Sequence, residues 1–316
     1  MTVRMPSRKV VAAVAGGGAL LVATPLVAHA VISRDAPPTV AAKGAALVDV
    51  SGKDDEGGKD GKSVFAKEAD TVRPIASTTK IMVATVVLDT ENVDLGRRVP
   101  VEQAYRDYVT EHHASTADLQ TGDKLTVRQL LYAALLPSGA DAAYALADTF
   151  GEGDTKTQRV KSFVGKMNAK ADSLHLNKTR FSTFDGTGED ASTPKELVQL
   201  ARHAMRNPVF RKAVKTEKFK SEAPAANGRT RYYTWNNTNH LLDAYDGVIG
   251  IKTGTTAKAG ECLVFAATRG DKEFVGAVLN SKDRFQDAAK LLDHGFGSDD
   301  AKDMEIEEEP SDGAQD

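Results

Sequence analysis

Residues 75–90 read IASTTKIMVATVVLDT, a stretch that is apolar on nearly every side of a helix. A helix without a polar face lies inside a domain rather than on its surface. Ser77 stands at the start of this stretch and Lys80 follows three residues later, so both side chains project from one face. The pattern therefore predicts a buried helix that carries a hydroxyl and an amine at its amino-terminal end.

Strand-like segments lie on both sides of this helix in the sequence. Residues 45–50 (AALVDV) and 63–67 (SVFAK) predict one hairpin, and residues 260–269 (GECLVFAATR) and 273–280 (EFVGAVLN) predict a second. Helical patterns lie between the two hairpins. This order predicts a single α+β domain, in which distant segments share an antiparallel sheet packed with helices.

Capping residues mark three of the helices. Thr126 opens a capping-box pattern before LLYAALL, and Thr193-Pro194 precedes LVQLARHAM. Residues 284–294 (RFQDAAKLLDH) are amphipathic, and the pattern ends at Gly295.

The ends of the chain differ from its middle. Residues 1–30 carry three basic residues and no acid, then an apolar run and Ala28-His29-Ala30, which is typical of a secretory signal peptide. An uncleaved membrane anchor is the alternative. Residues 298–316 hold nine acids and one lysine, which predicts a disordered tail. Residues 31–297 then form the folded domain, with a charge of about +2, between a leader of +3 and a tail of −8.

Composition excludes several classes of protein. The net charge of −3 argues against a nucleic-acid-binding protein. Cys262, the only cysteine, excludes a disulfide framework and a thiolate-rich zinc site, and its apolar strand favours a packing role. The seven histidines show no His-Glu-x-x-His spacing, and the adjacent pair His112-His113 is interpreted as surface, so we expect no metal. Trp235 is the only tryptophan, and either core packing or a pocket wall would explain it.

Ser77 and Lys80 have a chemical interpretation and a structural one. Burial favours the neutral amine, and a neutral amine beside a hydroxyl at a helix start makes an activated nucleophile. A helix cap with an extended lysine would explain the same residues. A second Ser-x-x-Lys pattern, Ser192 to Lys195, spans the start of an exposed helix and is interpreted as structural.

Two further motifs follow along the chain. Ser138 lies in PSGAD, a tight connection between two helical patterns that an ordinary turn with an Asp cap would also explain. Lys252 begins Lys-Thr-Gly-Thr on a predicted strand, where Gly254 would let a ligand approach the backbone closely.

Ser-x-x-Lys, Ser-x-x and Lys-Thr-Gly, in this order, are the motifs of penicillin-binding proteins and serine β-lactamases. From about Ala45 to Phe296 the chain resembles the low-molecular-mass D-alanyl-D-alanine carboxypeptidases, including the blocks TRFSTFDGTG and NTNHLLDAYDGVIGIKTGTT. The resemblance implies a penicillin-binding-protein/β-lactamase-like fold, with an all-helical subregion beside the sheet. Ala140 departs from the Asn that the family usually has at the third position of the middle motif. Some actinobacterial members, including a DD-transpeptidase, also have a small residue there.

The resemblance implies roles for the motif residues. Ser77 would attack the carbonyl between the last two D-alanines of a peptidoglycan stem peptide, with Lys80 as general base. Ser138 and Lys252 would relay a proton to the leaving D-alanine. The backbone amides of Ser77 and Thr255 would form the oxyanion hole.

The substrate's carboxylate would be held by Lys252 together with the hydroxyls of Thr253 and Thr255. Water or an amine would release the acyl-enzyme, and β-lactams would acylate Ser77 covalently. No cofactor is implied. We expect an exported monomer that works on the outer side of the cytoplasmic membrane.

Two alternatives remain open. A class A β-lactamase would need the Glu of Glu-x-x-Leu-Asn, and Ser173 occupies that position before Leu176-Asn177. A non-catalytic wall-binding protein that kept the pocket would be consistent with Ala140.

Overall fold

The computed structural model of the protein describes residues 36–52 and 61–306. The leader predicted for residues 1–30 lies outside these residues. Within them, no helix combines the length and the apolar character that crossing a membrane requires.

A five-stranded antiparallel sheet joins the two ends of the domain. Its order is β2-β1-β11-β10-β9. The strands are β1 (Gly44–Asp49), β2 (Lys62–Lys67), β9 (Val248–Thr256), β10 (Gly260–Arg269) and β11 (Lys272–Ser281). In the register of β1 with β11, Gly44 lies opposite Leu279 and Asp49 opposite Phe274. The predicted sharing of one sheet by distant segments is therefore confirmed, and β9 lies at an edge of the sheet.

Helices cover both faces of the sheet. α6 (Pro194–Met205) packs on one face and α9 (Arg284–Phe296) on the other. Successive side chains of a strand point to opposite faces, so neighbouring strand residues contact different helices. Ala46 and Val264 belong to the cluster around α6, whereas their neighbours Leu47 and Leu263 belong to the cluster around α9.

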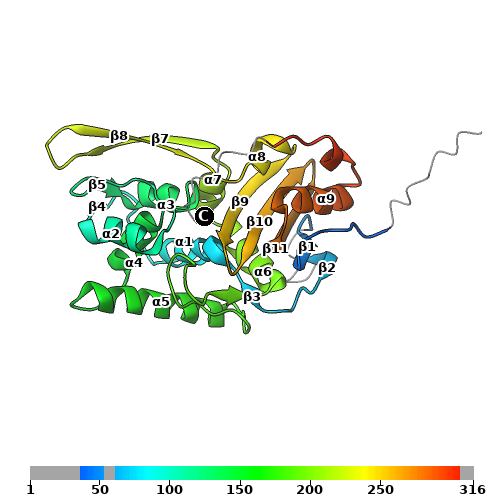
Figure 1. Ribbon diagram of the computed structural model, residues 1–316, viewed down its shortest axis with the longest axis horizontal. Helices are drawn as coiled ribbons and strands as arrows, with labels where there is room; N and C mark the ends of the chain where they lie inside the picture. The colour runs from blue at the N-terminus through cyan, green and yellow to red at the C-terminus, as the bar shows by residue number, and fades with distance from the viewer. Residues whose placement is uncertain (1–35, 53–60, 307–316) are drawn as a thin grey trace, which may run out of the picture. The chain divides into compact units, whose positions relative to one another are not determined.

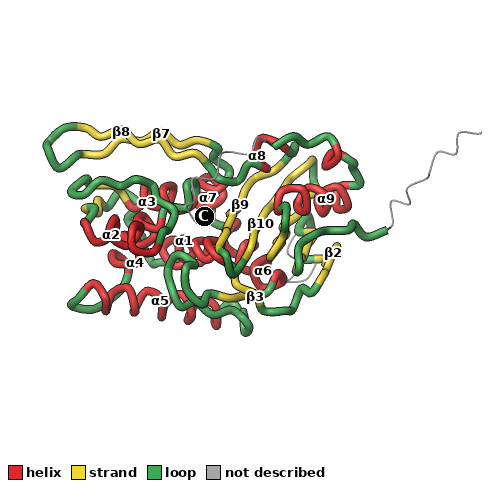
Figure 2. The backbone as a smooth tube through the Cα atoms, viewed as in Figure 1, coloured by secondary structure: helices red, strands yellow, loops and turns green. Residues whose placement is uncertain are grey.

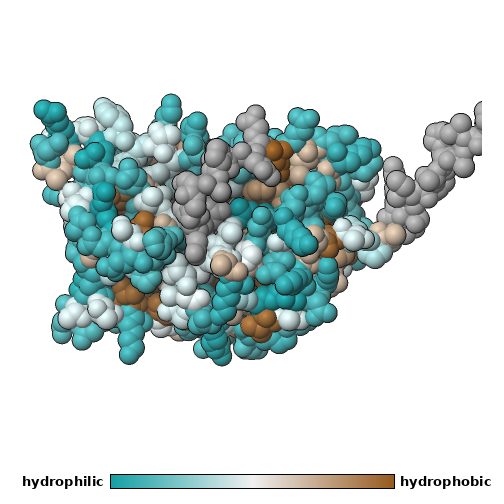
Figure 3. Space-filling model, in the orientation of Figure 1, coloured by the Kyte–Doolittle hydropathy of each residue, from teal (hydrophilic) through white to brown (hydrophobic). Residues whose placement is uncertain are grey.

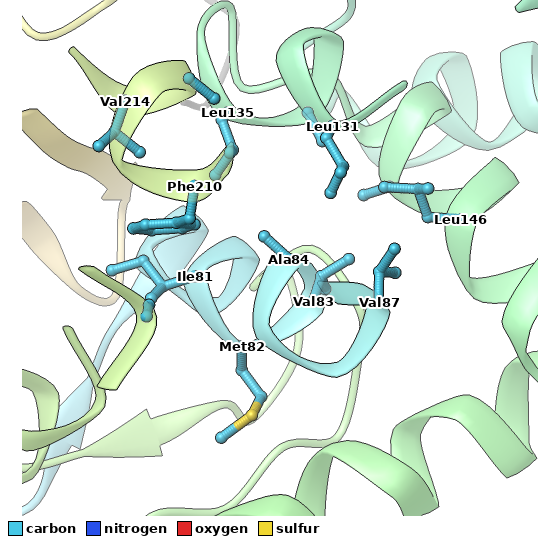
Figure 4. Packing of buried hydrophobic residues seen from close by; sticks show 14 of the residues in the cluster. Ile81, Met82, Val83, Ala84, Val87, Leu131, Leu135, Leu146, Phe210 and Val214 are labelled. Atoms are coloured by element: carbon cyan, nitrogen blue, oxygen red, sulfur yellow. The ribbon is translucent and has the colours of Figure 1, made fainter. Parts of the chain in front are cut away.

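Helix α1 (Lys80–Leu88) lies between the sheet and the other helices (Figure 1). All nine of its residues are buried, as the sequence predicts for an all-apolar helix. Figure 4 shows Val83, Ala84 and Val87 facing Leu131 and Leu146, while Ile81 lies against Phe210. The start of α1 is thereby held in a fixed place at the centre of the domain.

Most of the remaining helices form a subregion beside the sheet (Figure 2). They are α2 (Gln103–His112), α3 (Val127–Leu135), α4 (Ala140–Phe150), α5 (Lys156–Ser173) and α7 (Pro208–Val214). The short helix α8 (Leu241–Ala244) lies instead against β9, where Leu241 joins the cluster around α9. Three two-stranded pairs accompany them: β3 (Arg73–Pro74) with β6 (Ala191–Ser192), β4 (Arg98–Pro100) with β5 (Lys124–Thr126), and β7 (Lys218–Pro224) with β8 (Thr230–Asn236). The β4–β5 pair and the β7–β8 hairpin lie against this helical subregion.

Two predicted helix boundaries differ from the structure. The residues before Lys80 form a 3-10 turn, η1 (Ala76–Thr79), rather than the first turn of the α-helix. Helix α9 continues through Gly295, where a side chain would press on the Phe274 ring, and ends at Gly297 in the left-handed conformation (φ 75°). The capping predictions at Thr126 and Thr193 are confirmed.

The tail that is predicted to be disordered from residue 298 has an ordered first part. η2 (Asp300–Lys302) folds back on α9, Ala301 is buried, and Asp300 accepts a hydrogen bond from Arg269 at 2.7 Å. Residues 307–316 lie outside the described part of the chain. On the face shown in Figure 3, apolar residues form small separate patches among hydrophilic ones.

Candidate active site

The turn η1 and the start of α1 bring Ser77 and Lys80 into contact. Lys80 Nζ donates a hydrogen bond to Ser77 Oγ at 2.8 Å, and the two side chains are only 2% and 4% exposed, respectively. The buried helix fixes the lysine, and the 3-10 turn fixes the serine. The structure therefore pairs the hydroxyl and the amine as the sequence predicts, instead of extending the lysine to solvent.

Ser138 approaches the same lysine from the turn between α3 and α4. Its Oγ accepts a hydrogen bond from Lys80 Nζ at 3.4 Å. Ser138 has a positive φ of 65°, which is unfavourable for a residue with a side chain and is often found at functional sites. Ala140 begins α4 and is fully buried, and its N–H donates to the carbonyl of Ser115.

Strand β9 carries the Lys-Thr-Gly motif directly against η1, the turn that contains Ser77 and is called the serine turn below. A Cβ at Gly254 would lie 2.9 Å from Ser77 N, 3.0 Å from Thr78 N and 3.1 Å from Ile75 O. Only a glycine permits this approach without displacing the turn. The edge strand β9 thus lies beside Ser77.

Hydroxyl groups link the rest of this strand to its surroundings. Lys252 Nζ donates to Thr253 Oγ1 at 3.3 Å, and Thr253 Oγ1 lies 2.5 Å from Thr238 Oγ1. Thr255 Oγ1 accepts a hydrogen bond from Arg284 Nη1 at 2.7 Å. Sequence reasoning missed Thr238 and Arg284, which lie outside the three motifs.

A loop before β6 completes the surroundings of Ser77 and Lys80. The main-chain carbonyl of Asp185 accepts hydrogen bonds from Lys80 Nζ at 3.1 Å and from Ser77 Oγ at 3.3 Å. Sequence reasoning missed this contact too, although the loop lies in the block TRFSTFDGTG, which was part of the resemblance. A main-chain carbonyl leaves no signal of its own in a sequence.

The residues that were interpreted as structural are confirmed in that role. Ser192 is buried against Thr179 Oγ1 at 2.7 Å, away from its motif partner Lys195, which is exposed. His112 and His113 are exposed.

Cys262 and Trp235 belong to the core. Burial raises the pKa of the Cys262 thiol to about 11, so it is not a reactive thiolate at neutral pH. Trp235 is 3% exposed, and its Nε1 donates to the carbonyl of Ala117 at 2.9 Å. Between the two interpretations left open for the tryptophan, the structure selects core packing.

Comparisons with known proteins agree with this geometry. Residues 32–283 match the family described as D-alanyl-D-alanine carboxypeptidase (peptidase family S11). A D-alanyl-D-alanine carboxypeptidase of Streptomyces sp. strain K15 is 45% identical over 92% of this chain and 99% of its own length. A D-alanyl-D-alanine carboxypeptidase of Mycobacterium tuberculosis is 35% identical over 75% of this chain and 78% of its own.

A solved structure supports the fold. The crystal structure of the Streptomyces K15 DD-transpeptidase has 47% sequence identity and a TM-score of 0.79, and it covers 83% of this chain and 99% of that one. The penicillin-binding-protein-like α+β fold expected from the motifs is thereby confirmed. The chain therefore belongs to the D-alanyl-D-alanine carboxypeptidase family, and its predicted activity as a serine-type carboxypeptidase is confirmed by its relatives.

Proposed function

We propose that the protein removes the terminal D-alanine from peptidoglycan stem peptides that end in D-Ala-D-Ala, through an acyl-enzyme on Ser77. The observation that carries this assignment is the buried contact of 2.8 Å between Lys80 Nζ and Ser77 Oγ. A general base must lie within hydrogen-bond reach of the proton that it removes, and this pair meets that requirement.

The first step forms the acyl-enzyme. A neutral Lys80 amine takes the proton of Ser77, whose Oγ attacks the carbonyl carbon between the two D-alanines. The oxyanion is stabilised by the backbone N–H groups of Ser77 and Thr255, and each such donor is worth about 10²–10³ in rate in other acyl-transfer enzymes. The close packing of Gly254 on the serine turn supports this arrangement, because it places the two backbone segments side by side.

The amide bond then breaks and D-alanine leaves with a proton. Ser138 lies 3.4 Å from Lys80 Nζ and is placed to pass that proton on, with Lys252 as the second member of the relay. Lys252, Thr253 and Thr255 hold the carboxylate of the leaving residue. Arg284 orients the hydroxyl of Thr255, to which it donates at 2.7 Å.

Release of the acyl group defines a second candidate function. Water would complete a carboxypeptidase cycle, whereas an amine of another stem peptide would complete a transpeptidase cycle. The Streptomyces K15 relatives favour including transfer, because one is named as a carboxypeptidase and the other as a DD-transpeptidase. Diacetyl-lysyl-D-Ala-D-Ala, incubated with and without an amine acceptor, separates the two cycles through the free acid and the transfer product.

Labelling with a fluorescent penicillin tests the nucleophile. β-Lactams mimic the substrate, so the wild type should form a covalent adduct that maps to Ser77, and Ser77→Ala should abolish it. Lys80→Ala should lower the acylation rate at neutral pH by about 10²–10⁴-fold, the typical contribution of a general base. Full labelling of Ser77→Ala would overturn the assignment.

Turnover of a β-lactam and release of D-alanine distinguish the two alternatives. Ser173, which stands at the position of a β-lactamase glutamate, ends α5 and donates to the carbonyl of Lys170. It offers no carboxylate to activate water, so the penicilloyl adduct should persist. Rapid multiple turnover of nitrocefin would favour a β-lactamase, and failure to release D-alanine from the peptide would favour a non-catalytic wall-binding protein.

The place of action follows from the substrate. Stem peptides lie outside the cytoplasmic membrane, and the signal peptide expected for residues 1–30 would export the chain to that side. Mass spectrometry of the secreted protein would show whether cleavage follows Ala30.

A further inference from the structure

The loop that contains Asp185 is pressed onto the turn that carries the nucleophile. Gly186 has a φ of 96°, and a Cβ there would lie 2.0 Å from the carbonyl oxygen of Ala76 and 2.9 Å from Ser77 N. The preceding carbonyl, that of Asp185, accepts hydrogen bonds from both Lys80 Nζ and Ser77 Oγ. The direction of this one carbonyl therefore affects where both reacting atoms lie.

The Asp185 carbonyl differs from the hydroxyls that also contact Lys80. In the proposed mechanism Ser77 gives up a proton and Ser138 relays one, whereas a carbonyl exchanges none. It can hold the lysine in the same place before and after proton transfer. Ala140, buried at the third position of the middle motif, brings no side-chain polar atom that could share this task.

A network of hydrogen bonds holds the side chain of Asp185. Its Oδ1 accepts from Thr187 Oγ1 at 2.9 Å, from Thr187 N at 3.2 Å and from the Tyr108 hydroxyl at 3.2 Å. Tyr108 and Thr187 also contact each other, with their oxygens 3.0 Å apart. The carboxyl group is completely buried, so these donors determine its position.

Tyr108 reaches the network from α2 and is well suited to donate. Burial and the neighbouring carboxylate of Asp185 raise the pKa of Tyr108 well above its usual range, so its hydroxyl keeps its proton. Its ring is fixed separately, by contacts with Tyr144 and Phe184 at 5.4 and 5.0 Å between ring centroids. Removing the hydroxyl alone would leave this packing in place.

We propose that Tyr108 and Thr187 are positioning residues for acylation, which hold Asp185 so that its carbonyl orients Lys80 Nζ and Ser77 Oγ. The proposal rests on the function proposed above. The proposed carboxylate-binding set of Lys252, Thr253 and Thr255 includes neither residue, so their loss should affect the acylation step and not the affinity that precedes it. Misplacement by about 1 Å can lower a rate about 10²-fold, so we expect a decrease of about 10- to 100-fold.

The test uses the saturation kinetics of labelling by a fluorescent penicillin. The double variant Tyr108→Phe/Thr187→Val keeps the shape of both side chains and removes both hydroxyls. We expect its limiting acylation rate constant to fall at least about tenfold, with the half-saturating concentration within about twofold of wild type. Thr187→Ser, which keeps the hydroxyl, should react close to the wild-type rate.

Tyr144→Phe is the matched control, because its ring belongs to the same cluster but the hydroxyl has no place in the network. It should react as wild type. The proposal is overturned if the double variant is acylated at the wild-type rate, if its half-saturating concentration accounts for the loss, or if Tyr144→Phe is slowed equally. If the double variant does not fold, as judged by circular dichroism, Tyr108→Phe alone decides by the same criteria. Absence of wild-type labelling at Ser77 would instead refute the proposed function.

Discussion

Replacing Gly254 by alanine should push strand β9 away from the turn that carries Ser77, and it does so by adding a single methyl group. A Cβ at this position would lie 2.9, 3.0 and 3.1 Å from three main-chain atoms of the serine turn. Ordinary contacts of a methyl group begin near 3.4 Å, so strand and turn must move apart by about half an ångström. Main-chain atoms cannot rotate out of the way as a side chain can. The methyl group therefore displaces the backbone segments that we propose form the oxyanion hole.

The expected effect follows from that displacement. Overpacking of this kind lowers the free energy of unfolding by about 1–3 kcal/mol. The rate should fall further than the stability suggests, because a shift of about 1 Å in a catalytic group can cost about 10²-fold. We expect Gly254→Ala to acylate with penicillin about 10- to 100-fold more slowly at saturation, while urea unfolding shows a folded protein.

Gly276→Ala serves as the control for overpacking alone. Gly276 lies on β11, where the added Cβ would press on the Phe265 ring at 2.3 Å and not on the serine turn. We expect it to lose stability and to keep the wild-type acylation rate constant. Two results would refute the reasoning: a Gly254→Ala protein that reacts at the wild-type rate, or a Gly276→Ala protein that is slowed as much.

Three further predictions concern stability and reactivity. Burial alone would raise the pKa of Glu273, but the hydrogen bonds and the charge of Arg211 hold that pKa below its ordinary value of 4.5. The stabilising effect of this ion pair is therefore present above pH 4.5 and is lost as the pH falls through the lowered pKa. Glu273→Gln should therefore lower the free energy of unfolding by about 1 kcal/mol at pH 7, a modest figure because the arginine is partly exposed, and urea titrations should show the difference shrinking below pH 4.5. Cys262, with its pKa raised to about 11, should not react with a thiol reagent at pH 8 until the protein is unfolded; reaction in the folded state would show that the strand opens. Trp235→Phe leaves the carbonyl of Ala117 without its donor and should lower the free energy of unfolding by about 1–3 kcal/mol. Unfolding is followed by circular dichroism, because the substitution removes the only tryptophan. Unchanged stability would mean that the carbonyl finds another donor.

The sequence predicts the fold well where local patterns decide it. The apolar helix, the capping box at Thr126 and the two sheet hairpins depend on neighbouring residues, and the structure has all of them. The 3-10 turn at Ser77 and the end of α9 depend instead on contacts with distant strands. Gly295 has the appearance of a helix terminator in the sequence, but the ring of Phe274 occupies the space beside it. Such packing cannot be found from residues close to it in the chain.

The candidate active site also has a part that local patterns predict and a part that they do not. Ser77, Lys80 and Lys-Thr-Gly can be found because the chemistry proposed for them requires particular side chains at particular spacings. The carbonyl of Asp185 could have been supplied by any residue, so the sequence carries no requirement at that position. The sequence does contain the residues that orient this carbonyl. They are Gly186, which permits the close approach to the serine turn, and Tyr108 and Thr187, whose side chains hold Asp185. A motif with Ala140 in its third position is therefore compatible with a fully organised nucleophile, provided that this second group of residues is present.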